Sequence, residues 1–274
     1  MTSFRQQRFL GVTFLLLSSA AILAAYQRYG PQFPRLSYLS GAVLFAVMLV
    51  LALYNGRKKL PFLPLFTSET WLQFHIYAGF ITVILFLVHI RFRAPTGWFE
   101  TILAWLYVLV TGSGIVGLVV TRTLPKRLTT RGGEVLFERI PVIRRGLQQQ
   151  AETLALKAMP EVHSTTIADF YTRHLQDFFD GPRNLYLHIM EVRRPQNLLQ
   201  NKITDLHRYL NDGERQTLDQ IAMLVRQKDG LDYHQALQLL LRGWLFIHIP
   251  LTYSLLMFSV VHIVLVYAFS GGAR

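Results

Sequence analysis

Long uncharged stretches alternate with charged connections along this 274-residue chain. Five windows contain no Asp, Glu, Lys or Arg, and the shortest of them has 19 residues. A helix of about 20 residues, rising about 1.5 Å per residue, crosses the roughly 30 Å apolar core of a bilayer. The pattern therefore predicts five membrane-spanning helices. The windows are residues 9–27, 36–56, 70–90, 101–121 and 243–273.

The segment between the fourth and fifth windows has the opposite composition. Residues 122–242 hold 14 of the 16 acidic residues and 18 of the 28 basic residues. Apolar residues recur there at a spacing of three or four, which indicates helices that bury one face and expose the other. The predicted helices are 143–158, 165–179, 196–210, 213–228 and 232–242, and the predicted breaks are Pro141, Pro160, Gly181-Pro182 and Gly230.

Together these patterns predict an all-α protein, an integral membrane helical bundle with a helical soluble insert between its fourth and fifth spans. Spans one to four occupy residues 1–121, the insert occupies 122–242, and the fifth span in 243–274 completes the bundle. The last insert helix, DYHQALQLLLRGW, runs into the fifth span without a helix-breaking residue. We expect a rigid helical connection at that junction.

Composition excludes several classes of protein. Without cysteine the chain is no disulfide-stapled scaffold, cysteine zinc site, iron–sulfur protein or covalently attached c-type haem protein. The net charge of +12 would suggest nucleic-acid binding on a soluble chain, but ten basic and two acidic residues, a balance of +8, lie outside residues 122–242. These residues flank the apolar windows, so we expect membrane lipid, and no nucleic acid, as a partner.

The basic flanks also predict the orientation of the chain. With the N-terminus inside, ten basic residues lie at inner ends of the spans and five at outer ends, which follows the positive-inside rule. We predict a bacterial inner-membrane protein with a cytoplasmic N-terminus and insert. A cleaved secretory signal is the alternative for the first span. The inner residues are Arg5, Arg8, Arg57, Lys58, Lys59, Arg122, Lys126, Arg127, Arg131 and Arg242, the outer ones are Arg28, Arg35, Arg91, Arg93 and Arg274, and the interfacial tryptophans are Trp71, Trp98 and Trp244.

Four of the nine histidines lie inside the apolar windows. His75 and His89 are 14 residues apart in the third span, and His248 and His262 are 14 residues apart in the fifth. On a helix this interval keeps both side chains within roughly 40° of one face and about 21 Å apart along the axis. Because one crossing separates the two spans, they run in the same direction. The sequence predicts a His75–His248 pair near the inner leaflet and a His89–His262 pair near the outer leaflet.

Three interpretations of these pairs compete. Each histidine can satisfy a polar partner within the bundle, which is the ordinary role of a lone membrane histidine. A zinc, nickel or copper site wants three or four protein ligands, often carboxylates, and the windows contain neither Asp nor Glu. A b-type haem needs only two axial nitrogens from facing helices, because the porphyrin supplies the other four. The duplicated spacing, together with the cost of ionisable residues in a membrane, favours two haems.

The histidine segments resemble those of the dihaem b-type membrane cytochromes. The resemblance is to cytochrome b of bc-type complexes, and more loosely to the membrane domains of ferric reductases and NADPH oxidases. It rests on WLQFHIYAGFITVILFLVHIRFR and GWLFIHIPLTYSLLMFSVVHIVLVYAF, and continues through HIRFRAPTGWFE and TGSGIVG, over residues 70–122 and 243–269. It implies two haem b groups, one ligated by His75 with His248 and the other by His89 with His262.

The same resemblance implies electron transfer across the membrane, with a quinone, other redox subunits or a soluble electron carrier as partners. The chain would then be the cytochrome b subunit of an oxidoreductase complex. It lacks the Pro-Glu-Trp-Tyr signature, and 121 residues separate its last two spans. We therefore do not expect the outer quinol site of bc-type complexes, nor a flavin or nicotinamide domain like that of the ferric reductases.

Glycines near the histidines are candidates for haem contact. Gly112, Gly114 and Gly117 form a G-x-G-x-x-G motif, but its position in the middle of a span excludes a nucleotide-binding loop. Small residues let a backbone or a flat porphyrin approach closely. With Gly79, one turn after His75, these glycines predict clearance for the inner haem, and plain helix packing is the alternative.

Charged residues at the ends of the spans are weaker candidates. Arg91 and Arg93 follow His89 and match the propionates of an outer haem, with lipid phosphate as an equal alternative. Glu69 and Glu100 are candidates for proton exchange with a quinone, although a simple interfacial carboxylate is the more ordinary role.

Two other functions compete with electron transfer. A non-redox transporter or scaffold would use the buried histidines structurally, and a sensor or assembly protein would report the redox state of its haems through the insert. The insert lacks a phosphate-binding loop and a compact carboxylate–histidine cluster, so we expect it to dock a partner or cover the inner haem without a cofactor of its own. Its histidines, which we expect to be exposed or locally hydrogen-bonded, are His163, His174, His188, His207 and His234.

Overall fold

The computed structural model describes residues 4–33, 36–57, 68–129, 135–162, 165–192 and 194–270. Every regular element within these ranges is a helix, which confirms the all-α class. The chain divides into two compact units, here called the apolar unit (Met1–Leu118 and Trp244–Arg274) and the insert unit (Val119–Gly243). Of the basic flanking residues and insert histidines named above, those that the structure does not describe are Arg35, Lys58, Lys59, Arg131, His163 and Arg274, together with the side chains of Arg5, Arg8 and Arg57.

The apolar unit consists of helices that have the length and hydropathy of membrane spans. They are α1 (Phe4–Tyr29), α2 (Leu36–Arg57), α3 (Ser68–His89), α4 (Trp98–Leu128) and α10 (Asp212–Ser270), with the short η1 (Gly30–Gln32) after α1. The five candidates agree with the five predicted windows. In each of these helices, at most 22% of the most apolar stretch is buried inside the protein. Most of the apolar surface of these helices therefore faces outward. Apolar surface of this extent is typical of helices that contact lipid or other apolar partners.

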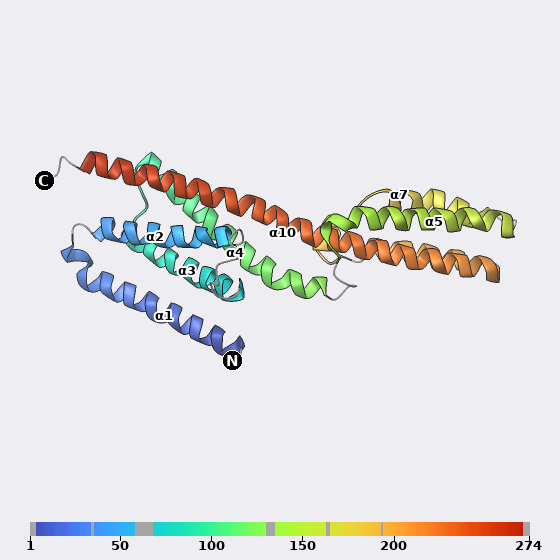
Figure 1. Cartoon of the computed structure of the whole chain (residues 1–274), viewed down its shortest axis with the longest axis horizontal. Helices are drawn as coiled ribbons and strands as arrows, with labels where there is room; N and C mark the ends of the chain where they lie inside the picture. The colour runs from blue at the N-terminus through green and yellow to red at the C-terminus, as the bar shows by residue number, and fades with distance from the viewer. Residues whose placement is uncertain are drawn as a thin grey trace. The chain divides into compact units, whose positions relative to one another are not determined.

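The core of the apolar unit is made by four helices. In the middle of the unit α2 packs along α3, which also contacts α1 (Figure 1). Tyr107 of α4 stacks on Phe86 of α3, with ring centroids 4.1 Å apart. The Tyr107 hydroxyl donates to Thr82 Oγ1 at 3.0 Å, and Thr82 donates to the Gly79 carbonyl at 2.6 Å. These polar groups are neutral and hydrogen-bonded, as an apolar surrounding requires. The buried apolar residues of this core are Leu44, Leu85, Tyr107 and Leu255.

The insert unit is a compact helical domain with its own core. Its elements are the end of α4 from Val119, η2 (Phe137–Arg139), α5 (Ile140–Val162), α6 (Thr166–Phe170), a π-helical turn η3 (Tyr171–Leu175), α7 (Gln176–Asp180), α8 (Leu185–Ile189), α9 (Arg194–His207) and the first part of α10, up to Gly243. Apolar residues of α5, α6, α7, α9 and α10 pack together in one buried cluster. The predicted amphipathic pattern therefore corresponds to real helices, and α8 is an element that the pattern did not predict.

Pro141 and Pro160 lie at the two ends of α5, inside its first and last turns, and only the predicted break at Gly230 is wrong. Pro141 lies in the first turn of α5, where its missing N–H would have had no partner in the helix. Pro160 lies in the last turn of α5 and removes one backbone hydrogen bond without ending the helix. Gly230 lies inside α10, where a glycine costs about 1 kcal/mol and the buried residues on both sides offset that cost. Only the Gly181-Pro182 pair separates two helices, α7 and α8.

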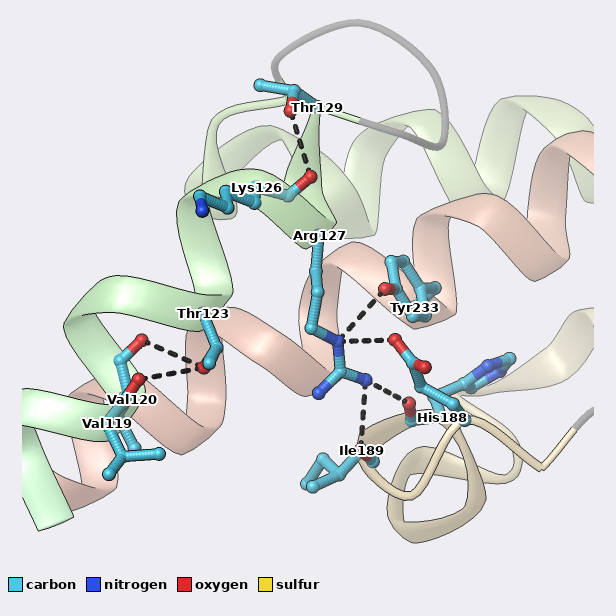
Figure 2. Close-up of polar contacts among 10 residues, drawn as sticks. Val119, Val120, Thr123, Lys126, Arg127, Thr129, His188, Ile189 and Tyr233 are labelled. Carbon is cyan, nitrogen blue, oxygen red and sulfur yellow. Dashed lines mark hydrogen bonds and ion pairs between the residues drawn. The ribbon is translucent and has the colours of Figure 1, made fainter.

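Arg127, near the end of α4, ties other elements of the insert unit together (Figure 2). Its Nη2 donates to the carbonyls of His188 and Ile189, at 3.0 and 2.9 Å, where α8 ends. Its Nε lies 2.8 Å from a carboxylate oxygen of Glu191 and 3.3 Å from the Tyr233 hydroxyl. The backbone φ of Glu191 is 58°, in the left-handed region. Arg127 therefore caps two carbonyls at the end of α8 and pairs with the acid that follows them.

A second polar network of the insert unit is fully buried. Lys228 Nζ lies 2.5 Å from Asp232 Oδ2, and both side chains are almost completely shielded from solvent. The same carboxylate accepts a hydrogen bond from the Arg183 backbone N–H at 3.0 Å, and Arg144 Nη2 lies 3.6 Å from its other oxygen. Lys228 also lies over the ring of Phe178, 4.0 Å from its centroid. The negative charge of Asp232 thus has several compensating partners in a region without water access.

Candidate functional site

The His89–His262 pair comes together as the sequence predicts. The ring centroids of these residues are 6.4 Å apart and the rings are nearly perpendicular, at 89°. A metal–imidazole bond is about 2 Å long, so two such bonds in line, together with the two ring radii, separate the centroids by about 6 Å. The spacing of this pair therefore matches that of two imidazoles on opposite sides of one metal ion.

A contact with helix α2 determines which ring nitrogen of His89 carries the proton. The Nδ1 of His89 lies 2.9 Å from the backbone carbonyl oxygen of Ser37. A carbonyl can only accept a hydrogen bond, so Nδ1 carries the proton and Nε2 keeps its lone pair. The ring also lies against Gly41, where an added Cβ would come within 2.7 Å of it. Ser37 and Gly41 were not singled out in the sequence, and the only signal for them is that small residues lie one turn apart in a span.

His262 is supported by aromatic rings of α4 and α10. Phe99 of α4 stacks on His262 with centroids 6.3 Å apart and the planes inclined by 20°. Phe99 also stacks on Phe258, one turn before His262, at 5.9 Å. These contacts restrict how the imidazole can turn. Phe99 is thus a further residue of the site that sequence reasoning missed.

Helix α4 fixes His248 in the same way that α2 fixes His89. Ser113 Oγ lies 2.7 Å from His248 Nδ1 and 2.9 Å from the carbonyl of Val110. The hydroxyl has one proton, which it donates to Val110, so it accepts from His248. The Nδ1 of His248 therefore carries the proton and Nε2 keeps the lone pair.

The ring of His75 is 5.3 Å from that of Tyr54 on α2, with the planes inclined by 42°. Its Nδ1 is buried without a hydrogen bond of ordinary geometry among the described residues, although the Leu51 carbonyl is near it. His248 lies near His75 as predicted, but this pair is less closely described than the His89–His262 contact. Because His75 and His89 are partnered in order by His248 and His262, α3 and the C-terminal part of α10 run in the same direction, as predicted.

The glycines divide between two roles. A Cβ on Gly114 would lie 3.8 Å from the ring of His248, so this glycine is beside the His75–His248 pair as expected. A Cβ on Gly79 or Gly112 would meet no atom within 4 Å. Gly117 packs directly against the indole of Trp244. Gly117 therefore serves helix packing, whereas clearance for a porphyrin at Gly79 and Gly114 stays a prediction.

The turn after α3 has an unusual backbone. Two hydrogen bonds close it, from Phe92 N–H to the Leu87 carbonyl at 2.9 Å and from Arg91 N–H to the Val88 carbonyl at 3.1 Å. This kind of helix end normally has glycine in the left-handed position. Here Arg91 and Phe92 have φ angles of 54° and 56°, at a cost of about 1–2 kcal/mol per residue. The Phe92 ring packs 5.6 Å from that of Tyr26, which helps to hold the turn.

This turn directs Arg91 toward the residue that holds His89. Arg91 Nε donates to Ser37 Oγ at 3.1 Å, while the carbonyl of Ser37 accepts from His89. The side chain of Arg93 is exposed, and its backbone N–H bonds to the Ile90 carbonyl within the turn. The structure thus connects Arg91, and not Arg93, to the His89–His262 pair through a described contact.

The carboxylates proposed for quinone chemistry lie at helix starts. Glu69 is in the first turn of α3 and Glu100 in the first turn of α4, and both are exposed. An acid in the first turn is favourable because it faces the positive end of the helix dipole. This location supports the simple interfacial role that competes with proton exchange.

The structure adds detail to the tryptophan and histidine expectations. Trp244 is half-buried and donates its indole N–H to the Ser113 carbonyl at 2.8 Å. Of the two alternatives for the insert histidines, exposed or locally hydrogen-bonded, exposure is wrong for His188 and His234, which are buried and pack against Tyr233 in the domain core. His188 Nε2 also lies 3.7 Å from Asp229.

Within the part of the chain that the structure describes, no three His, Cys, Asp or Glu residues gather in a way that could hold a metal ion. Comparison of the chain with models of protein families, with curated proteins and with solved structures finds no match.

Proposed function

We propose that this chain is a dihaem b-type cytochrome of a membrane. One haem b binds at the His75–His248 pair and the other at the His89–His262 pair. The observation that carries the proposal is the position of two ring nitrogens: Nδ1 of both His89 and His248 lies within hydrogen-bond distance of a serine oxygen of a neighbouring helix. The Nε2 of each ring then presents the lone pair with which an imidazole binds a metal.

The arrangement favours haem over a metal ion bound by protein alone. The two imidazoles of the His89–His262 pair lie 6.4 Å apart between centroids, and the core of the same helix bundle is built from apolar residues. A zinc or copper site would need further ligands. When bound, haem supplies a one-electron carrier, because its iron changes between the ferrous and ferric states.

The region between the two pairs suits electron transfer within one chain. The 14-residue interval places the two ligand levels about 21 Å apart along the helix axis. Phe86 and Tyr107 stack between these levels, and Thr82 and Leu255 fill the same core. This region is packed and uncharged, so electrons would pass between the sites through protein from which water is excluded.

Arg91 supplies an electrostatic difference between the two sites. Its guanidinium is held by Ser37 beside the His89–His262 pair, at a place where it would pair with a haem propionate or, alternatively, with a lipid phosphate. A cation near a haem favours the reduced state and raises its potential. We therefore expect Arg91→Gln to lower the potential of this haem more than Arg93→Gln does. Equal effects of the two variants would contradict the role of Ser37 in directing Arg91.

The partners follow from the same proposal. Electrons would be exchanged with a quinone, a soluble electron carrier or other redox subunits of an oxidoreductase complex. The protein would lie in a bacterial inner membrane with its N-terminus and insert unit in the cytoplasm, as the basic flanks predict. The insert unit would dock such a partner or cover the inner haem.

The decisive experiment is a haem assay of purified protein made with ample haem supply. We expect two haems per chain in the pyridine haemochrome assay and the visible spectrum of low-spin b-type haem. His89→Ala and His248→Ala should each remove one haem, and His207→Ala, an insert residue, should remove none. Protein without haem under these conditions would refute the proposal.

A further inference from the structure

Ser113 of α4 makes two separate contacts with α10. Its backbone carbonyl accepts the indole N–H of Trp244 at 2.8 Å, and its hydroxyl oxygen lies 2.7 Å from Nδ1 of His248. Trp244 and His248 are one turn apart on α10, so both lie on the same side of that helix. One residue therefore holds two successive positions of the neighbouring helix.

The ring of His248 is restricted in two independent ways. The bond to Ser113 fixes the direction of Nδ1, and the Trp244 ring stacks on the imidazole with centroids 5.4 Å apart and planes inclined by 26°. Trp244 can reach this place because Gly117 has no side chain there. Together these contacts determine both the rotation of the imidazole and the nitrogen that carries the proton.

The three other histidines of the pairs lack such a side-chain acceptor in the described contacts. His89 donates to a backbone carbonyl, which no substitution of Ser37 removes. The contacts described for the rings of His75 and His262 are to aromatic residues. Ser113 is therefore the residue whose side-chain hydroxyl contacts a histidine that is a candidate haem ligand.

We propose that Ser113 is a positioning residue that sets the redox potential of the haem at the His75–His248 pair. An acceptor at Nδ1–H raises the basicity of the imidazole, and a more basic ligand stabilises the ferric state. The Ser113 hydroxyl thus lowers the potential of this haem and keeps His248 in the tautomer that binds iron. This inference rests on the proposed function, because it requires a haem at that pair.

The test compares Ser113→Thr with Ser113→Val, two side chains of nearly equal shape of which only the first has a hydroxyl. In a redox titration of the purified two-haem protein, Ser113→Val should raise the potential of one haem and leave the other unchanged. Ser113→Thr should restore the parent value. The control is Ser259→Ala, because Ser259 is a buried serine of α10 whose hydroxyl donates within its own helix, to Leu255 at 2.8 Å.

The outcomes separate the two proposals. A parent protein without haem would refute the proposed function. Two haems with potentials that are the same in the Thr and Val variants would refute the role of Ser113 alone. A readout that needs no haem is the ¹⁵N NMR spectrum of histidine-labelled protein, in which the Nδ1–H form of His248 should persist in the Thr variant and be lost in the Val variant. Retention of that form in the Val variant would also overturn the inference.

Discussion

The apolar unit and the insert unit both bury polar side chains, but of different kinds. Among the described residues, the buried polar side chains of the apolar unit are the neutral Ser40, Thr82 and Ser259. Those of the insert unit include five charged ones: Arg144, Glu214, Lys228, Asp229 and Asp232. A helix without water around it satisfies its polar groups most cheaply with hydroxyls that bond to backbone carbonyls. A domain surrounded by water can bury charges where they compensate one another.

This difference predicts that removal of one polar partner lowers the free energy of unfolding by different amounts in the two units. Removal of a charged partner in the insert unit leaves an uncompensated buried charge, whereas removal of a hydroxyl in the apolar unit leaves one unsatisfied neutral group. The following variants test that order in the full-length protein in detergent.

Asp232→Ala should have the largest effect. It leaves Lys228 buried without its carboxylate, so we expect a loss of about 3–5 kcal/mol in the free energy of unfolding of the insert unit. Thermal denaturation and hydrogen exchange of the insert amides measure this loss. The control is Asp219→Ala, because the Asp219 side chain is 66% exposed.

The double variant Lys228→Met, Asp232→Leu tests whether charge is the cause. Replacement of both partners by apolar groups of similar size is often nearly neutral, so much of the lost stability should return. A double variant as unstable as Asp232→Ala would show that the uncompensated Lys228 charge is not the cause of the loss.

Arg127→Gln should have an intermediate effect. It removes charged hydrogen bonds to two carbonyls at the end of α8 and the ion pair with Glu191, which together are worth about 1.5–3 kcal/mol. We expect faster hydrogen exchange in α8 and little change in α5. Lys126→Gln, at the adjacent exposed position, is the control, and equal exchange in both variants would contradict the capping role.

Tyr107→Phe should cost less, about 1 kcal/mol, because it removes a single neutral hydrogen bond to Thr82 and keeps the stacking on Phe86. The apparent melting temperature of the apolar unit measures this change, with the exposed Tyr29→Phe as its control. A loss larger than that of Arg127→Gln would reverse the proposed order between the two units.

The smallest effect is expected at the exposed pair of Glu138 and Arg242. The Arg242 guanidinium, 2.6 Å away, lowers the pKa of the Glu138 carboxyl. A lowered pKa stabilises the folded state above the unfolded pKa, and this contribution disappears as the pH falls through the folded pKa. Arg242→Gln should return the pKa toward its ordinary range in an NMR titration and change stability only slightly, because exposed pairs contribute little. An unchanged pKa would show that the contact does not persist in solution, and Arg226→Gln is the control.

The sequence predicts the spans and the histidine pairs because both depend on simple periodicity. Uncharged windows report span length, and two 14-residue intervals place His75 with His248 and His89 with His262 once two spans run in the same direction. Neither argument requires knowledge of how side chains pack. This part of the site could therefore be predicted from residue positions alone.

The supporting residues could not be predicted in this way. Ser37 acts through its backbone carbonyl, which every residue has, and Ser113 acts through a hydroxyl that resembles any other in a span. Trp244 fits the sequence pattern of an interfacial anchor, and its packing on Gly117 could not be read from that pattern. Gly230 illustrates the opposite error, because tertiary packing keeps the helix intact across a residue of low helix propensity.

The left-handed turn at Arg91 has a consequence for laboratory evolution. Glycine or asparagine would adopt the φ of 54° at lower conformational cost than arginine. Selection for heat resistance alone should therefore replace Arg91 early, and the selected proteins should tolerate heat better than the parent. If selection for the proposed electron transfer is applied together with heat, arginine should persist at this position. The residue found after each of the two selections would show whether the strained arginine is kept for that proposed function.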